Sequence, residues 1–395
     1  MADASLQKRE MIPELQIVRA IAILGVLSVH STSFATLDMV NSNYFFLYNF
    51  FNIFMKFGTT TFIFLSSFVL FYNYYTRPLD KKLITGFYKK RALYIIIPYL
   101  VFSVFYFAIL HFVYYPDRSF ADTIDSFISK VLTGKAYTHL YFVYISIQFY
   151  LLFPIFLWLL KKFPSLVKWA IPAGIIIQWA FFLMNKYVLE NPVPNRGSWS
   201  LSYFSYYLFG AALAIYYPKI KAWIIMNKNN ANAGRVVVWV TVWALWLVAG
   251  LFHVYMYYQT RLKLDSFNTT LFDLVWNVHA LLTAIVLLQL AFVLYRKLPF
   301  KLPQLISRLG ALSFGIYLIH PFFLLVYREY PLQTGTAWLY HFWYAGGFLL
   351  ALVGSWIVVS FVARFIPFSW VIFGNLPKPK KRPSGPAAPE KQLDV

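Results

Sequence analysis

Long apolar stretches recur along nearly the whole chain, and polar residues gather in the short segments between them. A helix that crosses the hydrocarbon core of a bilayer needs roughly 20 apolar residues at about 1.5 Å each. The pattern therefore predicts an all-α, polytopic integral membrane protein with about ten transmembrane helices. The predicted spans are residues 15–37, 57–75, 92–115, 139–160, 169–189, 200–217, 236–258, 271–294, 309–327 and 342–365.

The composition excludes an ordinary soluble domain. Hydrophobic residues make up 60% of the 395 residues and charged residues only 12%, whereas soluble domains carry roughly 25% charged residues. A soluble fold could not bury that much apolar surface.

The chain has a net charge of +21, and its basic residues are distributed unevenly between the two predicted sides of the membrane. Of the 35 basic residues, 25 fall in segments predicted on one side, nine fall on the other side, and Arg19 lies within a span. Since cytoplasmic loops are rich in Lys and Arg, the 25 mark the cytoplasmic side and place both termini there. The basic residues do not cluster on one domain, so lipid is the expected partner and nucleic acid is not.

Composition also predicts how the two ends of the chain are organised and where one domain boundary lies. The first apolar segment is too long for a signal-peptide core and has no small-residue cleavage site, so we interpret it as a retained helix. Residues 1–365 are predicted to form one transmembrane domain, and residues 366–395 a basic, Pro-rich cytoplasmic tail without order. The chain has no cysteine, which excludes thiolate chemistry, and we expect neither a metal site nor a tightly bound cofactor.

The first span carries an arginine and a histidine on one helix face. Arg19 and His30 are eleven residues apart, which separates them by about 20° around the helix and about 16 Å along it. Ionisable groups inside a membrane span are candidate functional residues. The alternative is that Arg19 extends to the headgroups while His30 hydrogen-bonds a neighbouring helix. The spacing alone favours neither interpretation.

The histidines indicate which residue type would act as a base. All seven are predicted in the outer half of the membrane, and His30, His279 and His320 lie deepest within spans. No nucleophile elbow, phosphate-binding loop, zinc motif or dinucleotide fingerprint occurs in the sequence. Histidine can accept the proton of a hydroxyl that attacks a carbonyl. The basic run of Lys89, Lys90 and Arg91 either contacts phosphates or anchors the topology.

Five sequence motifs, in order, resemble those of the acyltransferase 3 family, the membrane O-acyltransferases of bacterial polysaccharides and other glycans. The resemblance covers nearly all of the membrane part. The motifs are Arg19 to His30 in the first span, Phe64 to Phe68, Lys89 to Arg91 with Pro98 and Tyr99, His139 to Phe142 with Tyr150 to Pro154, and Ser313 to His320.

The resemblance implies roles for these residues. His30 is then the catalytic base or acyl relay, Arg19 is functional, and Lys89, Lys90 and Arg91 contact the phosphates of an acyl-CoA donor. Three positions depart from the family pattern: Gln16 replaces an acidic residue, Ile95 replaces a second arginine, and Ser67 replaces a glycine. Glu14 is a candidate substitute for the missing carboxylate. Further candidates for acceptor binding or support of the site are Ser66, His139, Tyr141, Asn277, His279, Ser313 and His320.

The sequence thus predicts a multi-pass O-acyltransferase of a bacterial plasma membrane. Its expected reaction moves an acyl group, acetyl in the first instance, from cytoplasmic acyl-CoA to a hydroxyl of a cell-surface or exported glycan. Two alternatives stay open. One is a succinyl transferase, which an additional outward-facing Arg or Lys in the pocket would favour. The other is a transporter of glycan or lipid that transfers no acyl group.

Overall fold

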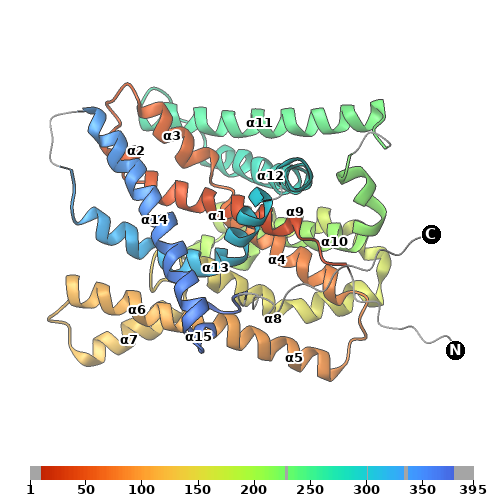
Figure 1. The fold of residues 1–395 in the computed structure, drawn as a ribbon, viewed down its shortest axis with the longest axis horizontal. Coiled ribbons are helices and arrows are strands. Elements are labelled where there is room, and N and C mark those ends of the chain that lie inside the picture. The colour runs from red at the N-terminus through yellow and green to blue at the C-terminus, as the bar shows by residue number, and fades with distance from the viewer. Residues whose placement is uncertain (1–9, 227–229, 300, 333–336, 378–395) are drawn as a thin grey trace, which may run out of the picture.

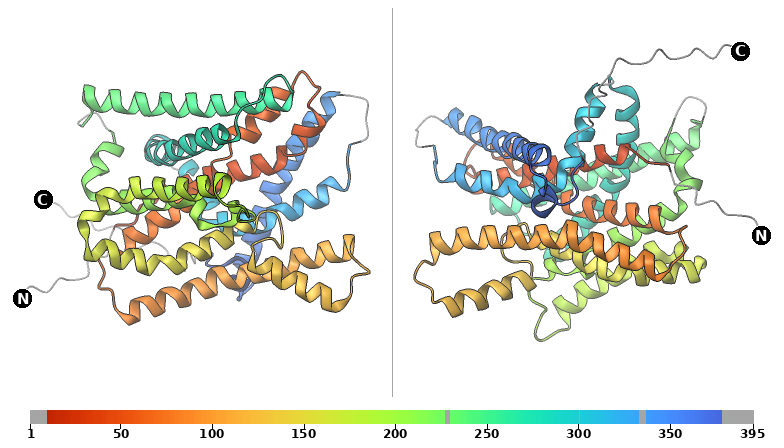
Figure 2. Two further views of the ribbon diagram at one scale, coloured as in Figure 1. Left: turned by 180° about the vertical axis from the view of Figure 1, so that it is seen from behind. Right: turned by 60° about the horizontal axis from the view of Figure 1, so that its bottom comes forward.

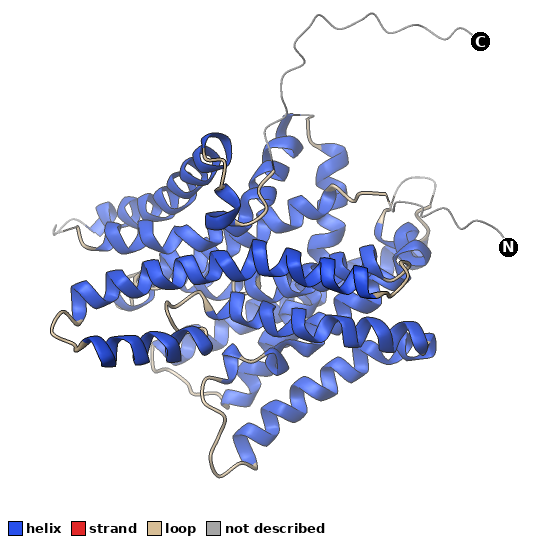
Figure 3. Ribbon diagram, turned by 90° about the horizontal axis from the view of Figure 1, so that it is seen from below, coloured by secondary structure: helices blue, strands red, loops and turns tan. Residues whose placement is uncertain are grey.

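The computed structural model describes residues 10–226, 230–299, 301–332 and 337–377. Within these ranges every regular element is helical, which confirms the predicted fold class (Figure 3). The α-helices are α1 (Glu14–Thr32), α2 (Ala35–Asp38), α3 (Phe45–Phe54), α4 (Gly58–Tyr74), α5 (Lys81–Arg91), α6 (Ile97–Tyr114), α7 (Phe120–Leu132), α8 (Tyr141–Lys162), α9 (Ala170–Tyr187), α10 (Phe204–Ile224), α11 (Ala233–Arg261), α12 (Thr269–Lys297), α13 (Lys301–Arg328), α14 (Ala337–Phe365) and α15 (Ser369–Phe373). Four shorter helical segments are η1 (Ala92–Ile96, a π-helix) and the 3₁₀ helices η2 (Pro164–Trp169), η3 (Arg196–Ser198) and η4 (Ser200–Tyr203).

Among the described residues, nine helical segments are long and apolar enough to cross a membrane. They match nine of the predicted spans. The tenth predicted span, residues 200–217, corresponds to α10, a helix of 21 residues that contains Pro218 and several tyrosines. This helix is less apolar than the other nine, and it packs against α4 and α9 in the centre of the molecule.

The basic connecting segments lie together at one end of the helices. In Figures 1 and 2 the α4–α5 and α8–α9 connections occupy one end, and the α6–α7 and α11–α12 connections occupy the opposite end. The Lys161 side chain donates a hydrogen bond to the backbone carbonyl of Arg77, so two of the basic segments touch directly. This arrangement agrees with the predicted positive side, which we call the inner side below.

Helix α1 lies at the centre of the bundle and contacts α13, α4, α12 and α14. The contact with α13 is very close, because a Cβ atom added at Gly310 would lie 1.8 Å from the backbone oxygen of Gln16. Small residues allow this kind of approach between transmembrane helices. The close packing sets the inner half of α1, including Arg19, beside α13.

Two helices lie where the sequence indicated only loops. Helix α3 precedes α4 and forms with it one apolar segment, residues 45–74. Helix α7 follows α6 in the predicted outer loop and is capped by Ser119, whose hydroxyl accepts a hydrogen bond from the backbone amide of Asp122. Neither helix has the length of a separate span.

The chain beyond residue 365 also contains an ordered element. Helix α15 (Ser369–Phe373) lies within the segment predicted to be a disordered tail, and it contacts α6, η1, α13 and α14. Residues 378–395 of that segment lie outside the described residues.

Candidate active site

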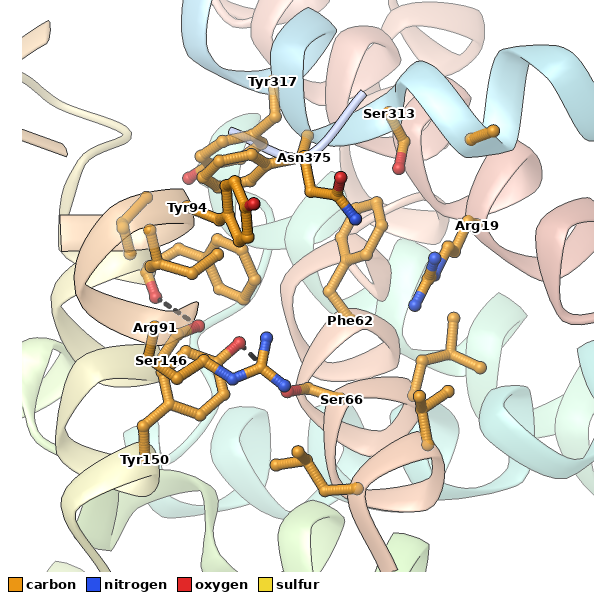
Figure 4. Close-up of a pocket in the computed structure, with 18 of the residues that line it drawn as sticks. Arg19, Phe62, Ser66, Arg91, Tyr94, Ser146, Tyr150, Ser313, Tyr317 and Asn375 are labelled. Atoms are coloured by element: carbon orange, nitrogen blue, oxygen red, sulfur yellow. Dashed lines mark hydrogen bonds between the residues drawn. The ribbon is translucent and has the colours of Figure 1, made fainter. Parts of the chain in front are cut away.

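A cavity of about 550 Å³ opens between α1, α4, α5, α8 and α13, and Asn375 also lines it (Figure 4). Among the described residues that line it, three are basic and none is acidic. Its polar and charged lining residues are Arg19, Ser66, Lys90, Arg91, Tyr94, Ser146, Tyr150, Ser313, Tyr317 and Asn375. The arginine of the first span and two of the three residues of the basic run therefore meet in one cavity.

The cations of this cavity have no carboxylate partner among the described residues. Arg19 donates a 3.4 Å hydrogen bond to the side-chain oxygen of Gln16, so the amide that replaces the expected acidic residue does face the arginine. The ion pairs among the described residues join Arg196 to Asp273 and Lys221 to Glu10. None joins Glu14 to Arg19, and the proposed substitution of Glu14 for the missing carboxylate does not occur in this structure.

Arg91 is held by aromatic rings. Its guanidinium lies 4.6 Å from the ring centre of Tyr150 and 5.2 Å from that of Phe87, and its buried Nε atom has no hydrogen-bond partner in the described part of the chain. Stacking of this kind orients a guanidinium and leaves its edge free for hydrogen bonds. Unpaired cations in a partly enclosed site are costly, so this lining is chemically suited to an anion.

The backbone changes its helical form directly after Arg91. Asp80 caps the start of helix α5, because its side chain accepts a 2.7 Å hydrogen bond from the amide of Leu83, and the helix continues into the π-helix η1 without a break. Single π turns inside α-helices are frequent at functional sites. Arg91 and Tyr94 both line the cavity from this junction.

Three histidines from distant parts of the chain meet beyond the cavity. The ring centres of His30 (α1) and His320 (α13) are 5.2 Å apart, and those of His139, which precedes α8, and His320 are 5.7 Å apart. His139 and His320 are fully buried, while His30 is only half-buried. The structure thus brings together three of the residues that the sequence singled out.

Backbone carbonyls orient two of the three imidazoles. His320 Nδ1 lies 2.8 Å from the carbonyl oxygen of Tyr317, and His139 Nε2 lies 3.2 Å from that of Leu318. A carbonyl can only accept, so these nitrogens carry the hydrogen atoms and donate. The other ring nitrogens of both residues are buried without partners in the described structure. His30 is the least buried member of the cluster, and its ring nitrogens have no hydrogen bond to any described residue.

Tyr317 connects the cavity to the histidine cluster. Its side chain lines the cavity, its ring centre is 5.8 Å from that of His320 and 5.2 Å from that of His139, and its hydroxyl donates to the backbone carbonyl of His139. Ser313, one helical turn earlier on α13, lines the cavity as well. The cavity therefore leads from the cationic residues to the edge of the histidine cluster.

The remaining candidates divide into those near the site and those away from it. Ser66 lines the cavity, with its hydroxyl 3.3 Å from that of Tyr150. Tyr141, two residues after His139, places its hydroxyl 3.3 Å from that of Thr59. Lys89 is exposed and does not line the cavity.

Asn277 and His279 lie elsewhere in the bundle. The side-chain oxygen of Asn277 accepts 2.5 Å hydrogen bonds from Gln178 and Tyr206, in a separate polar network. The His279 ring packs against Phe54 at 4.9 Å. These contacts do not place either residue with His30 or the cationic cavity.

Residues outside the predicted set also belong to the site. Arg328 donates a 2.6 Å hydrogen bond to the backbone carbonyl of His30 and a 3.2 Å hydrogen bond to the Ser33 hydroxyl, and its guanidinium lies 3.9 Å from the ring centre of Phe34. Tyr150 was not among the predicted site residues, but it opens the motif stretch Tyr150 to Pro154, which could have identified it. Nothing in the sequence indicated Asn375.

Comparison with known proteins agrees with this architecture. The sequence model of the acyltransferase 3 family, described as "Acyltransferase domain", matches residues 12–360. A relative in Bacillus subtilis (strain 168), "Putative membrane-bound acyltransferase YfiQ", is 22% identical over 385 residues, which cover 94% of this chain and 96% of the relative. No solved structure matches the chain. The chain therefore belongs to the acyltransferase 3 family and is a membrane acyltransferase.

Proposed function

We propose that this protein is an O-acyltransferase of the bacterial plasma membrane that moves an acyl group, in the first instance acetyl, from cytoplasmic acyl-CoA to a hydroxyl of a cell-surface or exported glycan. The observation that supports this most strongly is the cation-lined cavity that ends at Tyr317, beside the three histidines. A single site thus offers an anion-binding end and a proton-accepting end.

The donor would bind at the cationic end. Acyl-CoA carries phosphates at one end and its thioester at the end of a long flexible arm. Arg19, Lys90 and Arg91 line the cavity and have no acidic partner in the described part of the chain, which suits phosphate oxygens. Arg19 and His30 are about 16 Å apart along α1, a distance that an extended arm can span. The phosphates would stay near the inner side while the thioester approaches the histidine cluster.

His30 would act as the base for transfer. As the glycan hydroxyl attacks the thioester carbonyl, His30 accepts the hydroxyl proton and a carbon–oxygen bond forms. The tetrahedral intermediate then expels the CoA sulfur, which takes the proton from the imidazolium. His30 is half-buried while His139 and His320 are fully buried, so the substrates have better access to His30.

A dicarboxylic acyl group, such as succinyl, is the second candidate. The observation that favours it is Arg328, a half-buried cation whose guanidinium is hydrogen-bonded to the backbone of His30. Among the described residues no carboxylate lies within ion-pair distance of it. Membership in an acyltransferase family favours acyl transfer over the transporter alternative.

The test is transfer by the purified full-length protein in detergent. Labelled acetyl-CoA and labelled succinyl-CoA are supplied separately, with and without candidate bacterial surface glycans, and label is followed into water-soluble acid and into glycan. We expect transfer to glycan from one of the two donors. Failure to bind CoA and to consume either thioester would contradict the proposed donor. If the label appeared only in free acid and never in glycan, a glycan acceptor of the kind supplied would be contradicted.

A further inference from the structure

The chain folds back onto the site after α14, in a segment that we call the C-terminal turn (residues 369–375). It comprises α15, Gly374 and Asn375, and it contacts α6 and η1 (Figure 1). The family match ends at residue 360, so the C-terminal turn lies outside it. Whatever this segment contributes to the site is therefore not implied by the family match.

The C-terminal turn is fixed by buried aromatic contacts. Phe373 is 2% exposed, and its ring centre lies 5.6 Å from that of Phe102 on α6. The Trp370 ring meets the edge of Tyr94 at 6.3 Å. These contacts attach the turn to the same π-helix that carries Tyr94 into the cavity.

Gly374 allows the chain to approach the cavity closely. Its φ of 69° lies in a region that residues with a side chain rarely adopt. A Cβ atom at this position would lie 2.3 Å from the backbone oxygen of Tyr94 and 3.2 Å from the ring of Phe314. Only glycine therefore fits between Tyr94 and Phe314 in this conformation, and the next residue, Asn375, is directed into the cavity.

The side-chain amide of Asn375 faces the cavity. Figure 4 shows its side chain between Tyr94 and Arg19, pointing into the space that these residues line. The side chain is exposed and forms no hydrogen bond with any described residue. An asparagine amide offers two N–H donors and one acceptor oxygen in one plane, which matches a secondary amide of a ligand better than it matches a phosphate.

We propose that Asn375 hydrogen-bonds an amide of the pantetheine arm of the donor, so that the C-terminal turn forms part of the donor site. This inference rests on the proposed acyl-CoA donor. Three cations already supply the phosphate-binding groups of the cavity, and Asn375 is a neutral group among them. The pantetheine arm contains two secondary amides, and it must pass through the cavity to bring the thioester towards Tyr317.

The test measures the affinity of the full-length protein in detergent for CoA and for 4′-phosphopantetheine, which keeps the arm and lacks the adenosine. We expect Asn375→Ala to weaken both ligands by about 3- to 10-fold, the effect of one net hydrogen bond. Ser369→Ala, in the same turn but not lining the cavity, is the matched control and should leave both affinities unchanged. Gly374→Ala, which displaces the turn while keeping the Asn375 side chain, should weaken both ligands at least as much.

Different results would contradict the role of Asn375 and the acyl-CoA donor itself. Wild-type binding of CoA with unchanged affinities in Asn375→Ala would overturn the inference alone, as would unchanged affinities in Gly374→Ala. A loss for CoA without a loss for 4′-phosphopantetheine would place the contact on the adenosine and overturn the assignment to the arm. If the wild-type protein bound neither ligand, the proposed donor itself would be wrong.

Discussion

The two ends of the candidate site differ in how their charged and polar groups are satisfied. The cationic cavity presents three basic side chains that pair with no described carboxylate, and aromatic rings hold Arg91 in place. The histidine cluster presents three rings of which two are fully buried and oriented by backbone carbonyls. The first arrangement is suited to binding an anion, and the second to holding a base at a fixed position. Binding and chemistry should therefore be separable by mutation.

The first prediction tests whether the two ends face opposite sides of the membrane. The chain has no cysteine, so single cysteines can be introduced without removing any. Lys89→Cys, beside the cationic cavity, should react with a membrane-impermeant thiol reagent only after cells are opened. Asp117→Cys, exposed between α6 and α7, should react in intact cells. If Lys89→Cys reacted in intact cells and Asp117→Cys only in opened cells, the predicted orientation would be wrong.

The second prediction concerns the base. His30→Ala should lower glycan acylation by a factor of roughly 100 or more, because general base catalysis alone typically contributes that much. Transfer is measured with purified protein at saturating donor. His279→Ala is the matched control, since His279 is a buried histidine packed against Phe54. Per amount of folded protein, His279→Ala should keep most of the wild-type activity. An equal loss of activity in His30→Ala and His279→Ala would indicate a structural effect.

The third prediction concerns the phosphate contacts. Arg91→Gln and Lys90→Gln should each weaken CoA binding by about 10- to 100-fold, because a hydrogen bond to a charged group contributes about 1.5 to 3 kcal/mol. Lys89→Gln, the neighbouring exposed residue outside the cavity, should change the affinity little. Equal effects of Lys89→Gln and Lys90→Gln would indicate a general electrostatic role of the basic run.

The fourth and smallest predicted effect is that of Arg19→Lys. Lysine keeps the charge but loses the planar group that can form two parallel hydrogen bonds. We expect roughly tenfold weaker donor binding, equivalent to about 1.4 kcal/mol. An unchanged affinity would mean that Arg19 acts only as a point charge or extends to the lipid headgroups.

Helix positions and part of the site could be predicted from the sequence because both depend on short-range patterns. The apolar runs predicted where the membrane-spanning helices lie. The spacing of Arg19 and His30 predicted that both residues lie on one face of the first helix. The family motifs selected His139, Ser313 and His320, which the structure brings to α1. His279 was selected because it lies deep within a span, and Asn277 as a candidate for support of the site, and neither argument specifies which helices pack together. Their neighbours on α9, α10 and α3 satisfy or surround them away from His30.

Other features depend on long-range packing and could not be predicted. Helices α3 and α7 are too short to register as spans. Asn375 reaches the cavity only because Gly374 passes between Tyr94 and Phe314, and both of these residues are far from Gly374 in the sequence. The contact between Arg328 and the His30 carbonyl likewise joins the ends of two helices separated by most of the chain.

CoA affinity and acyl transfer, measured together in the wild-type, His30→Ala and Arg91→Gln proteins, show whether one site has separate binding and chemical ends. We expect His30→Ala to bind CoA with wild-type affinity but to transfer roughly 100-fold less acyl group. We expect Arg91→Gln to bind CoA about 10- to 100-fold more weakly and to regain most of its transfer rate at high donor concentration. Wild-type transfer by His30→Ala, or a loss of CoA binding in that variant as large as in Arg91→Gln, would contradict separate binding and chemical ends.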